Sequence, residues 1–332
     1  MKRLSIYMLA AGMAALSTSC SDFLDTVPKD QLAPSTTWQT EADAKGFIVG
    51  CYKDLLDGNT LLYLDCGSDI GYNNFPWEGF RPWGDGSLSS SNPGQILYDY
   101  KSIRKANTFL ENVDKVTFSS DAVKANYVAQ AKAIRAYKYF LMNWWYGGVP
   151  IVTKVQDPVE SSFVPRSTTK ACIEFICNDL DIAADMLRAK TTNGGWNGDN
   201  YGRVTTASAM ALKGRVLLLW ASPLFNRAND ESRWAAAYEY IKESIKDINA
   251  CGNHLYTTGN NINGSDFAKM FTVIQNPEMV FGTLHNMKQD DDTKKNNNWE
   301  RFIRPKNTTG QGLEASAMFV DMFPMKDGKR PR

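Results

Sequence analysis

The sequence predicts an all-α fold, in which helix pairs of the tetratricopeptide type are joined by long irregular loops, with few short strands. The first reason is periodicity: in six long segments apolar residues recur at intervals of three and four, as they do on the buried face of a helix. The second is that strand-like patterns are short, the best of them being residues 278–284. No self-similarity at the repeat length of about 34 residues is visible, so periodicity predicts helix pairs but not a regular solenoid.

Six helices follow from this period. The third is the clearest, because its apolar stripe runs without a break until Gly147 and Gly148 end it. The fifth ends before Pro223, and Gly214 inside it leaves room for a neighbouring helix to approach closely. We expect the six helices at residues 40–56, 96–113, 121–146, 168–188, 206–221 and 234–248.

The first nineteen residues have the organisation of an export signal. Lys2 and Arg3 precede a thirteen-residue apolar stretch, residues 4–16, which is shorter than the roughly 20 residues that span a bilayer. Three small residues and Cys20 follow, as in the lipobox of bacterial lipoproteins, although the leucine of that pattern stands one position further from the cysteine here. We therefore expect a lipoprotein signal peptide over residues 1–19 and a lipid anchor on Cys20. Ordinary cleavage nearby, which would release an unlipidated exported protein, is the alternative.

The composition argues against several functional classes. Lys and Arg together number 37 against 36 Asp and Glu, so the formal net charge of +1 provides no general attraction to nucleic acid. Only two histidines are present, His254 and His285, so few imidazole side chains are available as zinc ligands or as general bases. The acidic run at 290–292 lacks the spacing of a calcium loop, and no nucleophile, phosphate-loop or dinucleotide motif occurs. No metal, cofactor or catalytic residue is therefore predicted, although an unmarked pair of carboxylates remains open.

A long polar loop, residues 57–95, holds the side chains best suited to a ligand. A loop of this length is usually functional or disordered, and its aromatic residues argue against disorder. The face of a Trp or Tyr ring suits the C–H face of a pyranose, while Asn, Asp and Arg form hydrogen bonds with the hydroxyl rim. The alternative is that the tryptophans only fasten the loop to the helices. The candidate glycan-binding residues are Asp65, Asp69, Tyr72, Asn73, Trp77, Arg81 and Trp83, with a further cluster at Trp299 and Arg301.

Several motifs, taken together, point to a known family. They are Cys20 to Pro28, Ala131 to Phe140 with the following Trp145 to Pro150, Gly202 to Val204, and Asp321 to Gly328. These stretches resemble the corresponding motifs of the RagB/SusD family of outer-membrane lipoproteins. The resemblance runs from Cys20 to the end of the sequence.

The resemblance implies a surface-exposed protein of the outer membrane that binds nutrients without cleaving them. Members of the family cap a TonB-dependent (SusC-like) transporter and deliver glycans or, in some members, peptides to it. Their helix pairs support a loop-rich ligand face, and in carbohydrate-binding members loop residues of the N-terminal half hold the sugar. The corresponding region here is Asp65 to Trp83. A lipidated helical scaffold of the transporter complex without its own ligand site is one alternative, and a surface hydrolase is another.

The resemblance also divides the chain. We expect a SusD-like N-terminal helical domain over residues 20–264, and the start of the family's C-terminal region over residues 265–332. Family members normally continue well past the motif at 321–328, so this second region looks cut short. An exposed apolar surface is expected where the missing part would pack.

Overall fold

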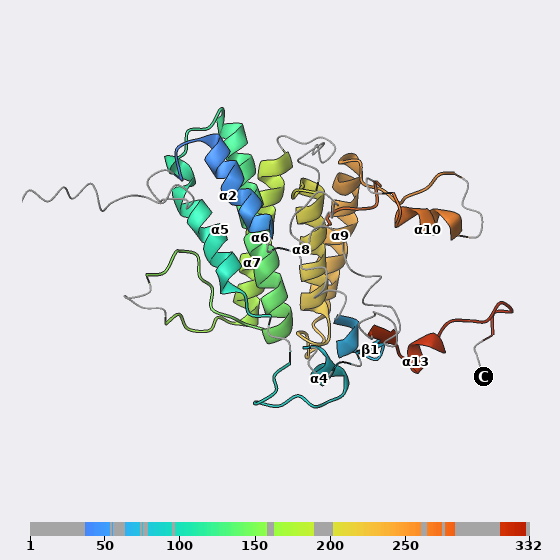
Figure 1. Ribbon diagram of the computed structural model, residues 1–332. Coiled ribbons are helices and arrows are strands. Elements are labelled where there is room, and N and C mark those ends of the chain that lie inside the picture. The colour runs from blue at the N-terminus through green and yellow to red at the C-terminus, as the bar shows by residue number, and fades with distance from the viewer. Residues whose placement is uncertain are drawn as a thin grey trace, which may run out of the picture.

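The computed structural model describes residues 37–53, 55, 64–73, 75, 79–94, 97–157, 163–188, 202–259, 264–273, 276–282 and 313–329. Within these ranges helices dominate, and the strands amount to one small two-stranded sheet. The prediction of an all-α fold with few short strands is therefore confirmed (Figure 1). Among the described helices, none is both long enough and apolar enough to cross a bilayer.

The long helices agree closely with the periods read from the sequence. Two of them have the predicted bounds residue for residue, and the others differ from prediction only at their ends. The long helices are α2 (Glu41–Lys53), α5 (Tyr100–Asn112), α6 (Asp121–Tyr146), α7 (Thr169–Arg188), α8 (Thr206–Ala221) and α9 (Glu231–Ala250). Shorter helical turns are η2 (Leu64–Gly67), α4 (Arg81–Gly84), η3 (Val113–Lys115), α10 (Ser265–Met270) and α13 (Ala317–Val320).

Two helix starts differ from prediction by three or four residues because capping side chains, which the apolar period does not reveal, determine them. Asp99 accepts a hydrogen bond from the main-chain N–H of Ser102 at 3.0 Å, so α5 begins at residue 100 instead of 96. Asp230 accepts one from the N–H of Ser232 at 3.0 Å, so α9 begins at residue 231 instead of 234.

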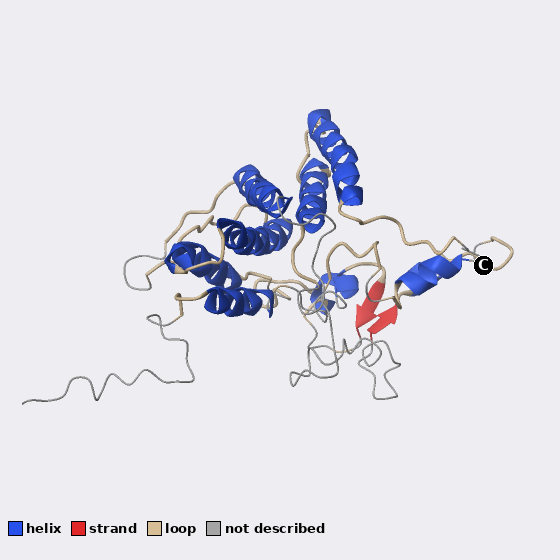
Figure 2. Cartoon of the chain, turned by 90° about the horizontal axis from the view of Figure 1, so that it is seen from above, coloured by secondary structure: helices blue, strands red, loops and turns tan. Residues whose placement is uncertain are grey.

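Successive helices pack against one another in chain order. α6 packs against α7, α7 against α8, and α8 against α9, while α2 and α5 both contact α6. Figure 1 shows these helices as a row of upright hairpins, and Figure 2 shows them side by side from above. This stacking of helix pairs is the arrangement that tetratricopeptide-type repeats adopt.

A buried ion pair crosses the core between α6 and α7. Nε of Arg135 lies 2.7 Å from Oδ2 of Asp179, and 6% and 1% of these side chains are exposed. Lys132 contacts the same carboxylate at 3.0 Å, and Arg135 also donates to Oδ1 of Asn107 on α5 at 2.8 Å. Because each charged group has a partner, the network aligns three helices without leaving a bare charge in the core.

The predicted close approach at Gly214 is confirmed. A Cβ atom added to this residue of α8 would lie 3.1 Å from Cγ1 of Ile241 on α9, closer than ordinary van der Waals contact. The two helices can therefore lie this close together because residue 214 has no side chain.

The strand expected at residues 278–284 is wrong over its described part. Residues 278–282 form turns and bends instead. The side-chain oxygen of Asn276 accepts hydrogen bonds from the N–H groups of Glu278 and Met279, both at 3.0 Å. An Asn side chain that binds the backbone two residues on closes a turn and so competes with an extended strand.

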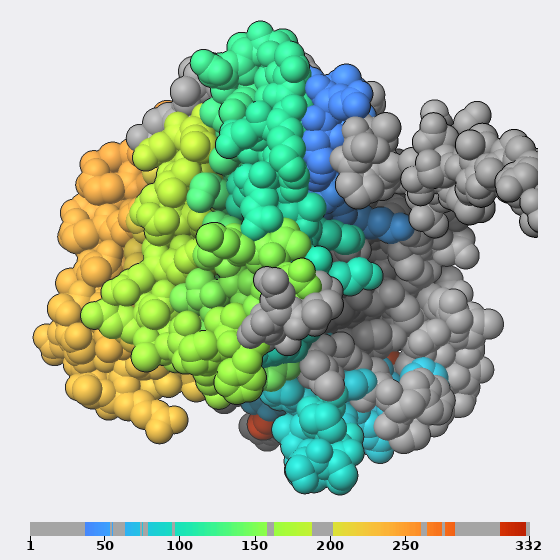
Figure 3. Space-filling view, turned by 90° about the vertical axis from the view of Figure 1, so that its left-hand side faces the viewer, coloured from blue at the N-terminus to red at the C-terminus, as the bar shows by residue number. Residues whose placement is uncertain are grey.

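The two strands of the sheet lie far apart in the sequence and side by side in the fold. β1 (Gly71–Asn73) and β2 (Leu313–Ala315) pair antiparallel, with Tyr72 opposite Glu314. Together with α4 and α13 they lie below the ends of the long helices (Figure 1). In the space-filling view, the cyan segment that contains α4 projects from the lower edge of the helical body (Figure 3).

Apolar side chains are exposed on the elements that follow α9. Phe267 of α10 and Phe271 directly after it are 68% and 73% exposed, and Phe323 after α13 is 59% exposed. Because large apolar side chains are also exposed elsewhere, such as Phe163 at 91%, the expected apolar surface against a missing part stays a prediction. The division of the chain at residue 264 stays a prediction.

Candidate functional site

Tyr72 and Arg81 are candidate residues that the structure brings into contact. The guanidinium carbon of Arg81 lies 5.4 Å from the centroid of the Tyr72 ring, within the range of a cation–π contact. Tyr72 is 37% exposed, so part of its ring remains available to a ligand. The two side chains come from β1 and α4, which contact each other and both pack against η2.

A carboxylate one helical turn away holds Arg81 in place. Nε of Arg81 lies 3.4 Å from Oδ2 of Asp85. Hydrogen bonds from Ser87, and then the charge of Arg81, hold the pKa of Asp85 below its ordinary value, so this carboxylate stays ionised. With 24% of its side chain exposed, Arg81 can still donate hydrogen bonds to a ligand.

Trp83 faces the helices rather than the solvent. Its ring packs edge-on against Trp145 at the end of α6, with ring centroids 4.6 Å apart. A Cβ atom added to Gly94 would collide with Nε1 of Trp83, and this nitrogen is buried with no hydrogen-bond partner among the described residues. Trp83 therefore fastens the loop to the helical body, which is the alternative that the sequence leaves open. A contact between Trp83 and a ligand stays a prediction.

Asn73, Asp65 and Asp69 differ in their access to a ligand. Asn73 is fully buried, and its Oδ1 accepts a hydrogen bond from the N–H of Phe75 at 2.8 Å, so it shapes the turn after β1. Asp65 and Asp69 are both exposed. The main-chain oxygen of Asp69 accepts a hydrogen bond from the hydroxyl of Ser316, which ties this segment to the end of β2. The two aspartates therefore provide accessible acceptors beside β1.

Several assignments from the sequence fall on residues that the structure does not describe. They are the signal peptide at 1–19, the lipidation site Cys20, the acidic run at 290–292, and the candidate glycan-binding residues Trp77, Trp299 and Arg301. These assignments stay predictions. In the described part of the chain, no group of three or more His, Cys, Asp or Glu side chains is placed to hold a metal ion.

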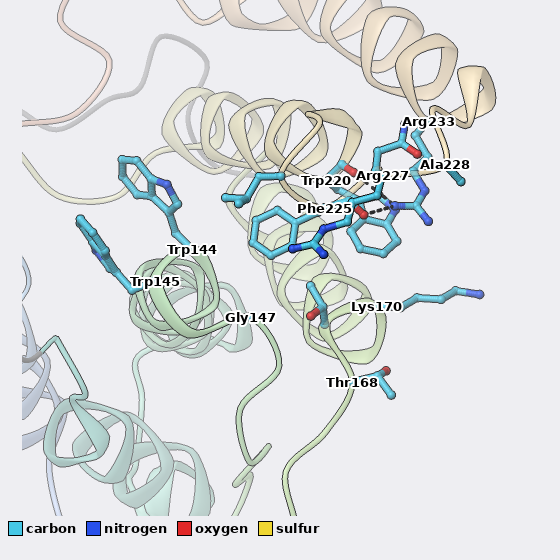
Figure 4. A pocket seen from close by; sticks show the side chains of 13 residues that line it. Trp144, Trp145, Gly147, Thr168, Lys170, Trp220, Phe225, Arg227, Ala228 and Arg233 are labelled. Atoms are coloured by element: carbon cyan, nitrogen blue, oxygen red, sulfur yellow. Dashed lines mark hydrogen bonds between the residues drawn. The ribbon is translucent and has the colours of Figure 1, made fainter. Parts of the chain in front are cut away.

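A cleft that the sequence did not predict opens between the ends of α6 and α8 (Figure 4). Its volume is about 670 Å³, and the first turn of α7 also lines it. The side chains that line it include Trp144, Trp145, Trp220 and Arg227. The Trp-Trp pair that closes a helix is a signal visible in the sequence, but only the fold brings it opposite the loop after α8. Because Trp145 also packs against Trp83, the cleft adjoins the candidate loop site.

The helical body matches a known family. A family model named SusD-like, described as starch-binding and associating with the outer membrane, matches residues 22–218. The chain belongs to the SusD-like family. The resemblance to RagB/SusD proteins is thus confirmed, and the family is described by starch binding and by its association with the outer membrane.

The similarity to an individual SusD-like relative is distant, and that relative is longer. SusD-like protein P25 of Formosa agariphila is 28% identical over 183 residues, which cover 50% of this chain and 34% of that protein. The chain therefore spans about a third of the length of this curated relative.

Solved SusD-like structures share the fold. A SusD-like protein from Bacteroides fragilis superposes with a TM-score of 0.68 at 24% identity, over 92% of this chain and 57% of that one. A laminarin-binding SusD-like protein superposes with a TM-score of 0.50 at 23% identity, over 58% of this chain and 43% of that one. At these sequence identities, the structural similarity shows a shared fold.

Proposed function

We propose that this SusD-like protein binds glycans at the cell surface, where it captures an oligo- or polysaccharide and passes it to a TonB-dependent transporter of the outer membrane. The observation that carries the proposal is the exposed Tyr72 ring with the Arg81 guanidinium beside it. The description of the family as starch-binding supports a carbohydrate ligand, and so does the structural neighbour that binds laminarin.

This arrangement suits a sugar ring that is held and not cleaved. The ring of Tyr72 offers a π face to the C–H bonds of a pyranose. Arg81 can donate hydrogen bonds to the hydroxyl rim, and the exposed Asp65 and Asp69 can accept them. Stacking and hydrogen bonding of this kind stabilise the bound sugar without any group that attacks the glycosidic bond.

A lipid on Cys20 would hold this binding face at the outer membrane. The lipobox-like residues 17–20 support such an anchor, and the description of the family as associating with the outer membrane agrees with it. A transporter partner follows from the RagB/SusD resemblance. Mass spectrometry of the protein from its native membrane tests the anchor, because an acylated Cys20 is heavier than a free N-terminal cysteine by the mass of its acyl chains.

Calorimetric titration of the full chain with starch- and laminarin-derived oligosaccharides tests the binding site. Tyr72→Ala is expected to weaken binding roughly tenfold, or about 1.4 kcal/mol, because the ring provides the stacking surface. Tyr238→Ala is the matched control. Tyr238 of α9 is 63% exposed, and Nζ of Lys242 lies 5.6 Å from the centroid of its ring. Because this similar aromatic–cation pair lies on another helix, its substitution should leave the affinity unchanged.

The alternatives give different results. Equal affinities of Tyr72→Ala and the unchanged chain would argue against this site. A chain that associates with its transporter but binds no glycan would be a scaffold. Release of reducing ends from a polysaccharide would indicate a hydrolase, and binding of peptides in place of glycans would assign the protein to the peptide-binding members of the family.

A further inference from the structure

We propose that the cleft between the ends of α6 and α8 is a second saccharide site, and that it takes a sugar with a carboxylate group, such as a uronic acid residue. This inference deepens the proposed function and rests on it, because it adds an acidic sugar to the glycans that the protein would hold. The volume of about 670 Å³ lies within the range of about 300–1,000 Å³ that is typical of small-molecule sites.

The described side chains that line the cleft include basic residues and no acidic ones. The basic side chains are Lys170, Arg227 and Arg233; Glu174 and Asp230, beside the lining, pair with Lys170 and Arg233 and leave the charge of Arg227 without a carboxylate partner among the described residues. The start of α7 lies in the same wall, where Oγ1 of Thr168 accepts a hydrogen bond from the N–H of Ala171 at 3.1 Å. The positive end of that helix dipole adds to the field of the basic side chains. An anionic ligand is therefore favoured.

Two of the three basic side chains are already engaged. Lys170 lies 3.7 Å from Glu174, and Figure 4 shows it directed away from the tryptophans of α6. The guanidinium carbon of Arg233 lies 3.7 Å from the ring centroid of Trp220, and its Nη1 donates to the main-chain oxygen of Phe225 at 2.9 Å. Neither is placed to serve as the main contact of a ligand in the cleft.

Arg227 is the basic side chain that is available. It is exposed and forms no ion pair or hydrogen bond with another described residue. Figure 4 shows its guanidinium directed across the cleft, toward the side on which Trp144 and Trp145 lie. A guanidinium binds a carboxylate through two parallel hydrogen bonds, which gives both strength and orientation.

The loop that carries Arg227 is held in one shape. The adjacent Asn226 is 4% exposed, and its Nδ2 donates to the main-chain oxygens of Ala221 at 3.2 Å and Asp230 at 3.0 Å. Its Oδ1 accepts a hydrogen bond from the N–H of Asp230 at 2.8 Å. These bonds close the turn between α8 and α9, so little backbone entropy remains to be lost when a ligand binds.

The opposite wall offers a surface for stacking. The rings of Trp144 and Trp145 stack with centroids 5.7 Å apart and planes inclined by 24°. Arg166 donates to the main-chain oxygens of Tyr146 and Gly148, which holds the end of α6 in place. A uronic acid residue can lay its C–H face on an indole while its carboxylate reaches Arg227. One sugar residue can thus contact both walls of the cleft at the same time.

Calorimetric titration of the full chain with two oligomers tests the inference. The first is an oligogalacturonide, and the second is the carboxyl-reduced oligomer of the same length and linkage. The acidic oligomer is expected to bind at least tenfold more tightly, and Arg227→Gln should abolish that preference. Arg227→Lys should keep part of it, because an ammonium group attracts the carboxylate without the two-point contact. Arg104→Gln is the matched control, since Arg104 is an exposed arginine of α5 that does not line the cleft and its loss changes the net charge equally.

Other outcomes would overturn the inference in distinct ways. The inference would be wrong if the unchanged chain bound the two oligomers with equal affinity, or if the Arg227→Gln variant still preferred the acidic oligomer. Either result would show that the cleft does not recognise the carboxylate. A sulfated oligosaccharide that binds more tightly than the uronic oligomer would show that the ligand group is a sulfate. If neutral glycans bind through Tyr72 while the carboxylate adds nothing, this inference fails and the proposed function stands. If no glycan of either kind binds, both fail.

Discussion

The indole of Trp83 packs edge-on against that of Trp145, with ring centroids 4.6 Å apart. Trp83 lies in the helical turn that also carries Arg81, and Trp145 belongs to the end of α6 and to the wall of the cleft. One aromatic contact therefore joins the two candidate binding sites to the same helix end. A substitution that weakens this contact should therefore lower the ligand affinity of both sites.

Trp83→Ala is expected to lower the free energy of unfolding by roughly 2–3 kcal/mol, somewhat less than the loss of a fully buried ring, since Trp83 is only partly buried. It should also weaken the binding of neutral and acidic oligosaccharides together. Urea denaturation measures the first effect, with Trp234→Ala as the control because Trp234 is 39% exposed on α9. An unchanged unfolding midpoint for Trp83→Ala would mean that this ring does not fasten the loop.

Asp179→Ala is expected to be strongly destabilising, because it leaves Arg135 and Lys132 without their carboxylate in the core. Breaking a buried ion pair costs about 3–5 kcal/mol. Asp181→Ala, two residues along the same helix, is the control. The side chain of Asp181 is 50% exposed in its bridge to Lys213, so its loss should cost at most about 1 kcal/mol. Similar losses for both variants in urea denaturation would contradict the assigned role of the buried network.

Gly214→Leu is expected to lower the free energy of unfolding by about 1–3 kcal/mol, because the new side chain would overlap Ile241. The double variant Gly214→Leu/Ile241→Ala should recover part of this loss, since the two positions are in contact. Gly46→Ala on α2 has no atom within 4 Å of the added Cβ and should instead stabilise the helix by up to about 1 kcal/mol. Thermal unfolding of the three variants checks this order of stabilities. A Gly214→Leu variant as stable as the unchanged chain would mean that α8 and α9 can move apart freely.

The ionisation of Asp99 should make the free energy of unfolding depend on pH in the acidic range. Burial by itself raises the pKa of Asp99, but hydrogen bonds from Ser102 and the bridge to Lys138 outweigh it, so the folded pKa lies below the ordinary value of 3.8. A carboxylate of this kind adds stability above its unfolded pKa and loses it as the pH falls through the folded pKa. The unchanged chain should therefore lose stability more steeply than Asp99→Asn between about pH 5 and pH 2. Asparagine still caps the helix, so parallel unfolding curves of the two proteins would contradict the pKa shift.

The helices were predictable because the information that defines them is local. The three-to-four spacing, with Gly147 and Pro223 as stop signals, was enough to locate α6 and α8 to the residue. Caps at Asp99 and Asp230 shifted the starts of two other helices, since a capping side chain lies outside the apolar period.

The candidate site was only partly predictable, because it depends on contacts between distant segments. The sequence pointed to Tyr72 and Arg81 by residue type, and the fold brings them into contact. It could not show that Trp83 turns toward Trp145, because residue type reveals what a ring can bind and not which way it faces. The cleft was missed for the same reason, since its walls come from four helices and the loop after α8.

The pairing of β1 with β2 implies an order of assembly. The hydroxyl of Ser316 binds the main-chain oxygen of Asp69 across 247 residues, whereas each long helix packs against neighbours in the sequence. Contacts between near neighbours form faster than contacts that close a long loop. The scaffold should consequently be complete before Tyr72 is presented, and the proposed sugar site is expected to be the last part of the molecule to form.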